Sequence, residues 1–500
     1  MNVSTDTVSL SVDSDSNASS TVITGAALDA LSDDPDELQS ELQALAGPSA
    51  GPNGGQIYID GFTGGQLPPK SSILAIRINQ NPFSAQYDQL GYGRIEIITK
   101  PGTDTYHGNL MTMFGDKVLN TSTPFLTAGQ PDYHTLFFMG NLTGPIKSGM
   151  SFTLSGSHRA MDNNTIVNPA SIYSTSPTSA MLCAPGDLVD NCNSYSFPFA
   201  ARAEATPATR WDISPRVDML LGAKNTLMTR YQYEAGNSSI NPKINSALLT
   251  TGSDSSSSDQ DIQISDTQLI SSKVINETRF EYEHSSSNSA PLNTAPAISV
   301  QGYFNVGGGS TSSSTGDHIE AQNYTSIQLV KNFVRLGGRL RASSESNYSN
   351  GGINGSFAYN YLLDPCTDPS GITKPSNCLA SLPINATPCS TANMTTGSPL
   401  YSSYQCGIVS QFGLKAINNY TISARETDLG LYAEDDWKAM SNLTISYGLR
   451  LEAQNVIHSA HDFAPRISVA LWHSASQWKD NDRSSRRFRR LLQPFFARQH

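Results

Sequence analysis

Most of the chain, from residue 107 to about residue 472, repeats one pattern, in which apolar and polar residues alternate. Because successive side chains of a β-strand point to opposite faces, this period predicts strands with one apolar and one polar face. We count about twelve such candidate strands. The clearest run places Leu443, Ile445, Tyr447, Leu449 and Leu451 against Thr444, Ser446, Gly448, Arg450 and Glu452.

Two kinds of fold fit this alternation. In a soluble sandwich the apolar face packs on a core, whereas in a transmembrane barrel it faces lipid. The sequence places short turns on one side of the strands and long loops on the other, at about 161–208, 235–263 and 361–418. This asymmetry is typical of outer-membrane barrels and favours the barrel. Its wet lumen would then be lined by charges such as Arg230, Glu234, Arg450 and Glu452.

Composition agrees with a barrel. Charged residues make up 15% of the 500 residues, and small polar residues are abundant. Soluble domains usually carry more charge, about a quarter of their residues. No apolar run approaches the roughly 18 residues of a spanning helix. The net charge of −11 argues against nucleic acid as a partner.

The N-terminal part has a different pattern. Residues 1–24 are rich in Ser, Thr and Asp and are expected to be a flexible lead-in. A capped helix is predicted to start near Asp33 and to bury Leu38, Leu42 and Leu45. Short alternating runs then predict strands around 57–60, 73–78 and 94–99. These elements predict a small α/β domain over residues 25–106.

This domain resembles the plug of TonB-dependent outer-membrane receptors. Three motifs of that family appear in order: Ile59-Asp60-Gly61-Phe62, then Ile73–Tyr87 with Pro82, Ser84, Ala85 and Tyr87 in step, then Gly93–Lys100. The sequence of Asn79–Phe83 is most similar to that of the large acidobacterial receptors, which often carry an N-terminal carboxypeptidase-regulatory-like domain. Residues 462–470 resemble a mid-barrel strand of the same family.

The resemblance implies a mainly β fold, with a plug at 25–106 and the N-terminal half of a transmembrane β-barrel at 107–472, about 12 of 22 strands. It also implies energised uptake of a scarce ligand, such as a siderophore, cobalamin or a saccharide, across the Gram-negative outer membrane. The partners would be a TonB-type inner-membrane energy complex, outer-membrane lipid and an unknown small ligand. No enzymatic activity and no cofactor are expected. Candidate motif residues and plug–barrel contacts are Asp60, Gly61, Arg77, Pro82, Tyr87, Arg94, Glu96 and Lys100.

Two alternatives remain open. The same barrel could serve as a surface or adhesion structural protein, or the chain could be a non-functional truncated remnant. Residues 473–500 lose the alternation and are strongly basic, which we interpret as an out-of-frame tail; a genuine arm for an acidic partner is the other interpretation. No signal peptide is visible at Met1, so we expect truncation at both ends.

Six cysteines lie in long stretches rich in Pro, Ser and Asn: Cys183, Cys192, Cys366, Cys378, Cys389 and Cys406. An even number in loops favours disulfides and an oxidising compartment. A Cys183–Cys192 bond would close a small loop, and the other four allow three pairings. A zinc site is the competing interpretation, but no CxxC spacing exists.

Motifs of catalysis and metal binding are not found. The sequence has no phosphate-binding loop, HExxH or GxSxG pattern. His458 and His461 lie beside Asp462, but the pair has no further ligand in sequence, and no metal site is expected there. The runs Ser255–Ser258 and Gly307–Gly309 are interpreted as loop linkers.

Overall fold

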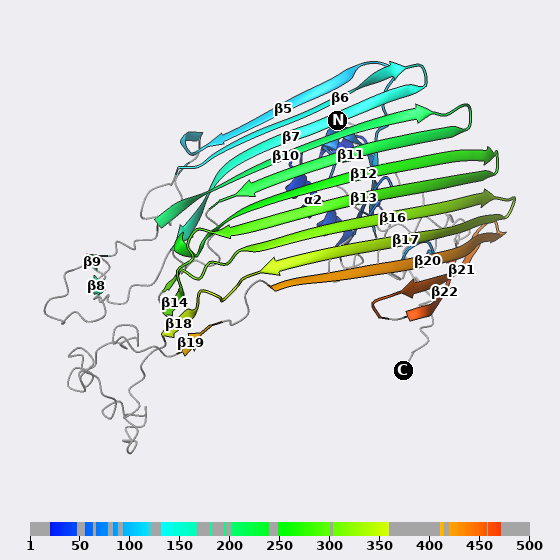
Figure 1. Cartoon of the computed structure of the whole chain (residues 1–500). Coiled ribbons are helices and arrows are strands. Elements are labelled where there is room, and N and C mark those ends of the chain that lie inside the picture. The colour runs from blue at the N-terminus through cyan, green and yellow to red at the C-terminus, as the bar shows by residue number, and fades with distance from the viewer. Residues whose placement is uncertain are drawn as a thin grey trace, which may run out of the picture.

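Two β-sheets dominate the computed structural model (Figure 1). One is a four-stranded sheet near the N-terminus, and the other is a twelve-stranded sheet that takes up most of the remaining chain. The structure describes residues 21–47, 56–63, 67–78, 84–88, 94–119, 121, 132–167, 181–182, 195–196, 202–239, 249–300, 304–359, 411–414, 420–457 and 459–471. The six cysteines, Pro82 and residues 473–500 lie outside these ranges.

The small sheet has the order β1-β3-β4-β2. β1 and β3, and β3 and β4, pair antiparallel, whereas β2 runs parallel to β4. We call the described residues between 21 and 100 the N-terminal unit. Its elements are β1 (Thr21–Ile23), α1 (Ala26–Asp29), α2 (Pro35–Ala46), β2 (Ile57–Ile59), the short 3-10 helix η2 (Lys70–Ser72), β3 (Ile73–Ile78) and β4 (Ile95–Thr99).

Helix α2 covers this small sheet with apolar side chains. The Glu37 backbone N–H donates to Asp34 Oδ1 at 3.3 Å, as expected for an N-terminal cap, and Gly47 follows the helix with φ of 59°. Leu38 and Leu42 are buried against the isoleucines of β3 and β4, as predicted. The predicted Leu45 is 51% exposed, and Ala46 is buried in its place. The buried face centres on Leu42, so a residue three positions later falls at its edge.

The large sheet is antiparallel throughout, in the order β22-β21-β20-β17-β16-β13-β12-β11-β10-β7-β6-β5. The mainly β fold and the count of about twelve strands are confirmed. β5 and β22 are its edges, so the described sheet is open. Its strands are β5 (His107–Asp116), β6 (His134–Lys147), β7 (Met150–Val167), β10 (Arg202–Leu220), β11 (Asn225–Ser238), β12 (Ser253–Ser271), β13 (Val274–Pro291), β16 (Ser312–Gln328), β17 (Asn332–Ser349), β20 (Tyr420–Met440), β21 (Leu443–Gln454) and β22 (Ser459–Leu471).

Short and long connections alternate along this sheet, as predicted. Short turns at one end occupy residues 148–149, 221–224, 272–273, 329–331 and 441–442 (right in Figure 1). Small strands in the described connections are β8 (Met181–Leu182), β9 (Tyr195–Ser196), β14 (Ala297–Val300), β15 (Phe304–Val306), β18 (Ser356–Tyr359) and β19 (Gln411–Gly413). The other short 3-10 helices are η3 (Lys117–Leu119) and η5 (Leu249–Thr251).

Strands extend into two of the predicted loops. The loop expected at 235–263 contains the end of β11 and the first half of β12, and the loop expected at 161–208 is shortened by β7 and β10. The predicted loop at 361–418 lies almost wholly outside the described residues. Strands extend into these stretches because backbone pairing needs no apolar side chains. A strand without alternating apolar residues gives no periodic signal in the sequence.

The large sheet carries its apolar side chains on the exposed face. Leucine, isoleucine and phenylalanine side chains stand outward along its strands, for example Leu154, Ile213, Ile262, Phe280, Ile319, Leu340, Leu429 and Leu449. The opposite, inner face holds buried polar side chains, including Arg230, Asp261, Gln263, Glu281, Glu320, Arg339, Glu434, Arg450 and Arg466. A contiguous exposed apolar band is unfavourable in water and is what a lipid-facing sheet requires.

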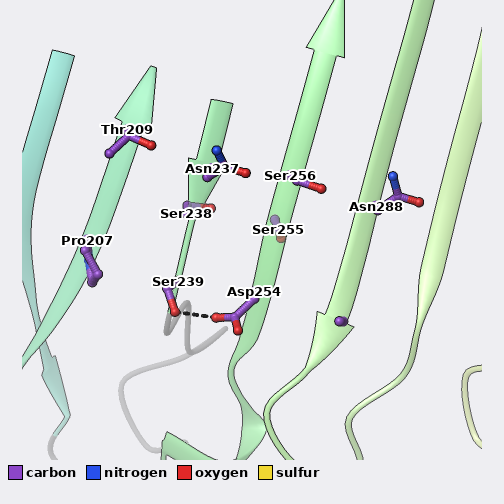
Figure 2. Close-up of a pocket in the computed structure, with 10 residues that line it drawn as sticks. Pro207, Thr209, Asn237, Ser238, Ser239, Asp254, Ser255, Ser256 and Asn288 are labelled. Atoms are coloured by element: carbon purple, nitrogen blue, oxygen red, sulfur yellow. Dashed lines mark hydrogen bonds between the residues drawn. The ribbon is translucent and has the colours of Figure 1, made fainter. Parts of the chain in front are cut away.

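The outer face becomes polar near the long-connection end. β12 has 19 residues, more than the roughly 9–11 that a tilted strand needs to cross a bilayer. Its extra length includes Ser255–Ser258, which were interpreted as a linker and instead pair with β11 and β13. A recess of about 430 Å³ lies at this end. Figure 2 shows residues that line it, including Pro207, Thr209, Asn237, Ser239, Asp254, Ser256 and Asn288. These strands therefore continue beyond the apolar band as a polar collar.

Within the described residues, no helix is long and apolar enough to cross a membrane. The predicted linker at Gly307–Gly309 does lie between strands, β15 and β16.

Candidate functional site

The N-terminal unit meets the inner face of the large sheet, and the tight turn after β2 lies at this contact. Ile59 and Phe62 exchange backbone hydrogen bonds of 3.1 and 3.0 Å across Asp60 and Gly61. Both central residues have positive φ, 52° and 84°, as a two-residue type I′ turn requires. Asp60 is the one non-glycine residue with positive φ in the described part of the chain. The motif at 59–62 thus has a conformational basis, because Asp-Gly is a favoured pair for this turn.

The Asp60 carboxylate forms an ionic cluster with the large twelve-stranded sheet, which we call the wall. Arg230 of β11 donates to its Oδ2, and Arg216 of β10 lies 3.4 Å from the same atom. Thr99 of β4 donates to both carboxylate oxygens, from its backbone N–H at 2.9 Å and its hydroxyl at 2.6 Å. Burial raises the pKa of Asp60, but the two arginines and Thr99 outweigh it, so the pKa lies below its ordinary value. Asp60 is therefore ionised, and it is held both by Thr99 of its own unit and by arginines of the large sheet.

A second ion pair joins Asp88 to the wall. Arg339 of β17 donates from Nη2 to Asp88 Oδ2 at 2.7 Å, and Arg341 lies 3.6 Å from that oxygen. Burial again raises the pKa of the carboxyl, and Arg339, Arg341 and Arg450 more than compensate, lowering the pKa of Asp88 to about 2. Two carboxylates of the N-terminal unit thus meet arginines on separate parts of the sheet.

The segment at Ser84–Gln86 is fixed by side chains from the last strands. The Ser84 hydroxyl donates to Glu434 of β20 at 2.8 Å, and the Ala85 N–H donates to the same carboxylate at 2.6 Å. Arg450 of β21 donates to the carbonyls of Ala85 and Gln86 at 3.3 and 3.2 Å. Arg466 of β22 donates to the Ser84 carbonyl. This part of the family motif is therefore a wall contact made mainly through backbone.

Three further contacts extend the interface across the sheet. Thr63 donates to Glu320 of β16 at 2.8 Å, and the N–H of Gly102, just after the N-terminal unit, donates to Asp218 of β10 at 3.2 Å. Asp34, at the start of α2, lies 3.2 Å from Arg159 of β7. The contacts thus reach from β7 to β22.

Three predicted contact residues, Arg94, Glu96 and Lys100, have hydrogen bonds or ion pairs inside the N-terminal unit. Arg94 stacks its guanidinium on the rings of Tyr58 and Tyr87, 3.7 and 4.3 Å from their centroids, and lies 3.5 Å from Glu96. Burial acts to lower the pKa of Arg94, but Tyr87 and Glu96 outweigh it and raise that pKa. Lys100 donates to the Ser71 carbonyl at 2.8 Å, and Arg77 stands opposite Glu96 in the sheet register. Arg94 also interacts electrostatically with Tyr324 of β16, and the role of Arg77, Arg94, Glu96 and Lys100 at the interface stays a prediction.

Sequence reasoning missed most of the wall side of this site. It named Arg230 and Arg450, but as lumen-lining charges in water, and both are buried under the N-terminal unit. Asp88 was not named, although it directly follows the motif residue Tyr87. Partners such as Asp60 and Arg230 are 170 positions apart, so no local pattern relates them.

Gly61 provides a test of how closely the turn approaches the wall. A Cβ at this position would meet the guanidinium of Arg279 of β13, so that side chain would have to move away from Glu277 and the Tyr324 ring, in addition to the strain of φ at 84°. We expect Gly61→Ala to destabilise the N-terminal unit by about 2–3 kcal/mol. The measurement is hydrogen exchange of β3 and β4 in increasing urea, with the full chain in detergent.

Gly47 is the matched control, because it lies in the same unit, directly after α2. It also has a positive φ, 59°, and open space around a new Cβ. Gly47→Ala should cost about 1 kcal/mol from backbone strain alone. Equal losses in the two variants would contradict the close approach to Arg279.

Asp88 gives a pH dependence of defined sign. Its pKa in the folded chain, about 2, is lower than the ordinary value of 3.8, so its ion pair is fully stabilising above about pH 4 and is lost as pH falls toward 2. We expect the wild-type chain to lose about 2 kcal/mol more than Asp88→Asn between pH 5 and pH 2. Urea unfolding of the N-terminal unit at each pH measures this difference. Parallel pH profiles for the two chains would contradict it.

Comparison with known proteins supports the interpretation of the fold. A family model described as outer membrane beta barrel domain matches residues 188–470. Among solved structures, the chain is similar to the ferric enterobactin receptor of Pseudomonas aeruginosa, with 13% identity, a TM-score of 0.52, and 90% of this chain and 59% of that chain covered. The siderophore receptor PirA of Acinetobacter baumannii gives 14% identity, a TM-score of 0.52, and 92% and 59% coverage.

The outer membrane transporter YddB of Escherichia coli is a further structural neighbour, with 10% identity, a TM-score of 0.50, and 80% and 46% coverage. The chain thus spans 46–59% of the length of these three structures. At such low identity the likeness establishes the fold. No curated protein sequence matches the chain.

These findings agree with the resemblance to TonB-dependent receptors and with an outer-membrane location, and the neighbours are named as receptors or transporters rather than enzymes. The family model covers more than half of the chain, and the large sheet has the outward apolar face that lipid requires. The chain belongs to the outer membrane β-barrel family.

Proposed function

We propose that the chain is the plug and part of the barrel wall of a TonB-dependent outer-membrane receptor, which takes up a scarce ligand with energy from an inner-membrane complex. Residues 25–106 act as the plug and residues 107–472 as the wall. The observation that carries this proposal is the seating of the N-terminal unit on the polar inner face by Asp60, Asp88 and the segment at Ser84–Gln86.

The chemistry of this interface suits a domain that moves. An apolar interface in its place would resist separation, because exposing apolar surface to water costs free energy in proportion to its area. Charged and hydrogen-bonding groups exchange their partners for water at a smaller net cost. The arginines of the wall also have acidic neighbours there: Arg335 lies 2.6 Å from Glu434, and Arg216 lies 2.7 Å from Asp218. The wall therefore keeps part of its charge balance when the plug shifts.

A ligand arriving from the long-connection end would meet a second recess, distinct from that in Figure 2. This recess has a volume of about 420 Å³, and Arg210, Glu234 and several serines line it. Arg210 and Glu234 are paired at 2.7 Å, and Arg159 of the same recess is paired with Asp34 of the N-terminal unit. Ligand contacts at this recess would thus reach the plug through one ion pair. Siderophore, cobalamin and saccharide remain the proposed ligand classes.

Energised displacement of the plug distinguishes a receptor from a surface structural protein. Ser84 is buried against Glu434, and Ser84→Cys changes its size little. We expect a membrane-impermeant maleimide to label this cysteine several-fold faster in energised cells than in cells treated with a protonophore. The difference should vanish in cells that lack the inner-membrane energy complex.

Two controls accompany this experiment. Asn288→Cys places a cysteine on the exposed polar collar and should be labelled equally under all conditions. The chain without an added cysteine reports labelling of its own six cysteines. Equal labelling of Ser84→Cys with and without energy would contradict the transport proposal and favour a structural role.

A further inference from the structure

A cluster of three potential metal ligands lies on the inner face, in the region covered by the N-terminal unit. Glu281 of β13 stands directly opposite Glu320 of β16, and His318 precedes Glu320 on the same face of β16. One ligand atom from each of the three side chains lies within 4.8 Å of the other two. Strand register, rather than loop conformation, sets this spacing, so the three groups are held by paired backbone.

Glu281 is buried with half of its carboxylate unsatisfied. Its side chain is 0% exposed, and Oε1 accepts a hydrogen bond from Gln263 at 2.8 Å. Its Oε2 has no hydrogen-bond partner in the described part of the chain. A buried carboxylate oxygen without a partner is costly, since burial removes its hydration without compensation. A cation or a proton bound at Oε2 would therefore stabilise buried Glu281.

A second buried carboxyl group lies on the neighbouring strand β12. Asp261 of β12 is 4% exposed, and neither of its carboxylate oxygens has a hydrogen-bond partner among the described residues. Asp261 interacts electrostatically with Glu281. Carboxyl groups are thus concentrated where water has been excluded, which favours either a divalent cation or a bound proton.

His318 is oriented for ligation. Its Nδ1 lies 2.9 Å from Ser343 Oγ, and its Nε2 lies 3.6 Å from Glu320 Oε2. With the proton on Nδ1 and donated to Ser343, Nε2 offers its lone pair to the cluster, an arrangement common to metal-bound histidines. Glu320 is also held from the N-terminal unit, because Thr63 donates to its Oε2 at 2.8 Å.

We propose that Glu281, His318 and Glu320 bind a divalent first-row transition metal ion between the wall and the N-terminal unit. One imidazole and two carboxylates suit ions such as Mn²⁺ and Zn²⁺. Binding of this ion does not rest on the proposed transport function. The competing explanation is a proton shared by the two glutamates, which satisfies the same buried oxygens without a metal.

Mn²⁺ is the sharper probe, because cysteine thiolates prefer softer ions and the chain has six cysteines. The full chain in detergent is stripped with a chelator and titrated with Mn²⁺, with free ion measured by electron paramagnetic resonance. We expect one Mn²⁺ per chain, displaced by Zn²⁺. Glu281→Gln and His318→Ala should each weaken binding at least about 100-fold, and Ser343→Ala about 10-fold.

His284→Ala is the matched control. His284 and Asp317 form an exposed pair, 2.9 Å apart, on the same two strands, and their removal should leave Mn²⁺ affinity unchanged. Thermal unfolding supplies a second readout. Without metal, Glu281→Gln should be more stable than the wild-type chain, and Mn²⁺ should raise the midpoint of the wild-type chain only.

The proposal is overturned if the wild-type chain binds no Mn²⁺ or Zn²⁺, or if Glu281→Gln binds as tightly as wild type. A more stable Glu281→Gln chain with no metal binding in either protein would establish the shared proton instead.

Discussion

The Asp60 carboxylate, held between Arg216 and Arg230 and only 13% exposed, is the contact on which the arrangement of the two sheets depends. Removing a charged group from water is expensive, and it is tolerated where opposite charge and hydrogen bonds surround it. Asp60 meets both conditions through the arginines and Thr99. The requirement also works in reverse for Arg230, which is 3% exposed and donates to Asp60, whereas Arg216 also pairs with Asp218 of the wall. The turn and the wall therefore specify each other's position.

This interface follows from the orientation of the large sheet. Its apolar side chains face outward, so its inner face must carry the polar residues of every alternating strand. A domain seated there finds arginines and acids rather than an apolar surface, and its own core must be internal. The isoleucines of β3 and β4 with Leu38 and Leu42 form that core. Two different solutions to burial are thus combined in one chain, an apolar core inside the small unit and ionic contacts around it.

The sequence was sufficient for the parts of the fold that local periodicity determines. Alternation predicted the twelve-stranded sheet, whereas the motif at 59–62 was identified by resemblance to a family, and its positive φ at two residues is a finding of the structure. It failed at Ser255–Ser258, where a strand continues beyond the bilayer without apolar residues. It also failed for Arg339, Glu434 and Arg466, whose partners lie 251–382 positions away. Arg77, Arg94, Glu96 and Lys100 are charged residues of family motifs, and neither charge nor the motif reveals which face of the unit a residue occupies.

The central claim is that Asp60 and Arg230 hold the N-terminal unit on the wall as a pair. A double-mutant cycle with Asp60→Asn, Arg230→Gln and both together tests it, using urea-dependent hydrogen exchange of β3 and β4 to obtain the free energy of unfolding. We predict a coupling energy of about 1–3 kcal/mol. The same cycle with Lys100→Gln in place of Asp60→Asn should be additive, because Lys100 donates to Ser71 within its own unit. Additivity of the Asp60 and Arg230 changes within about 0.5 kcal/mol would contradict the account.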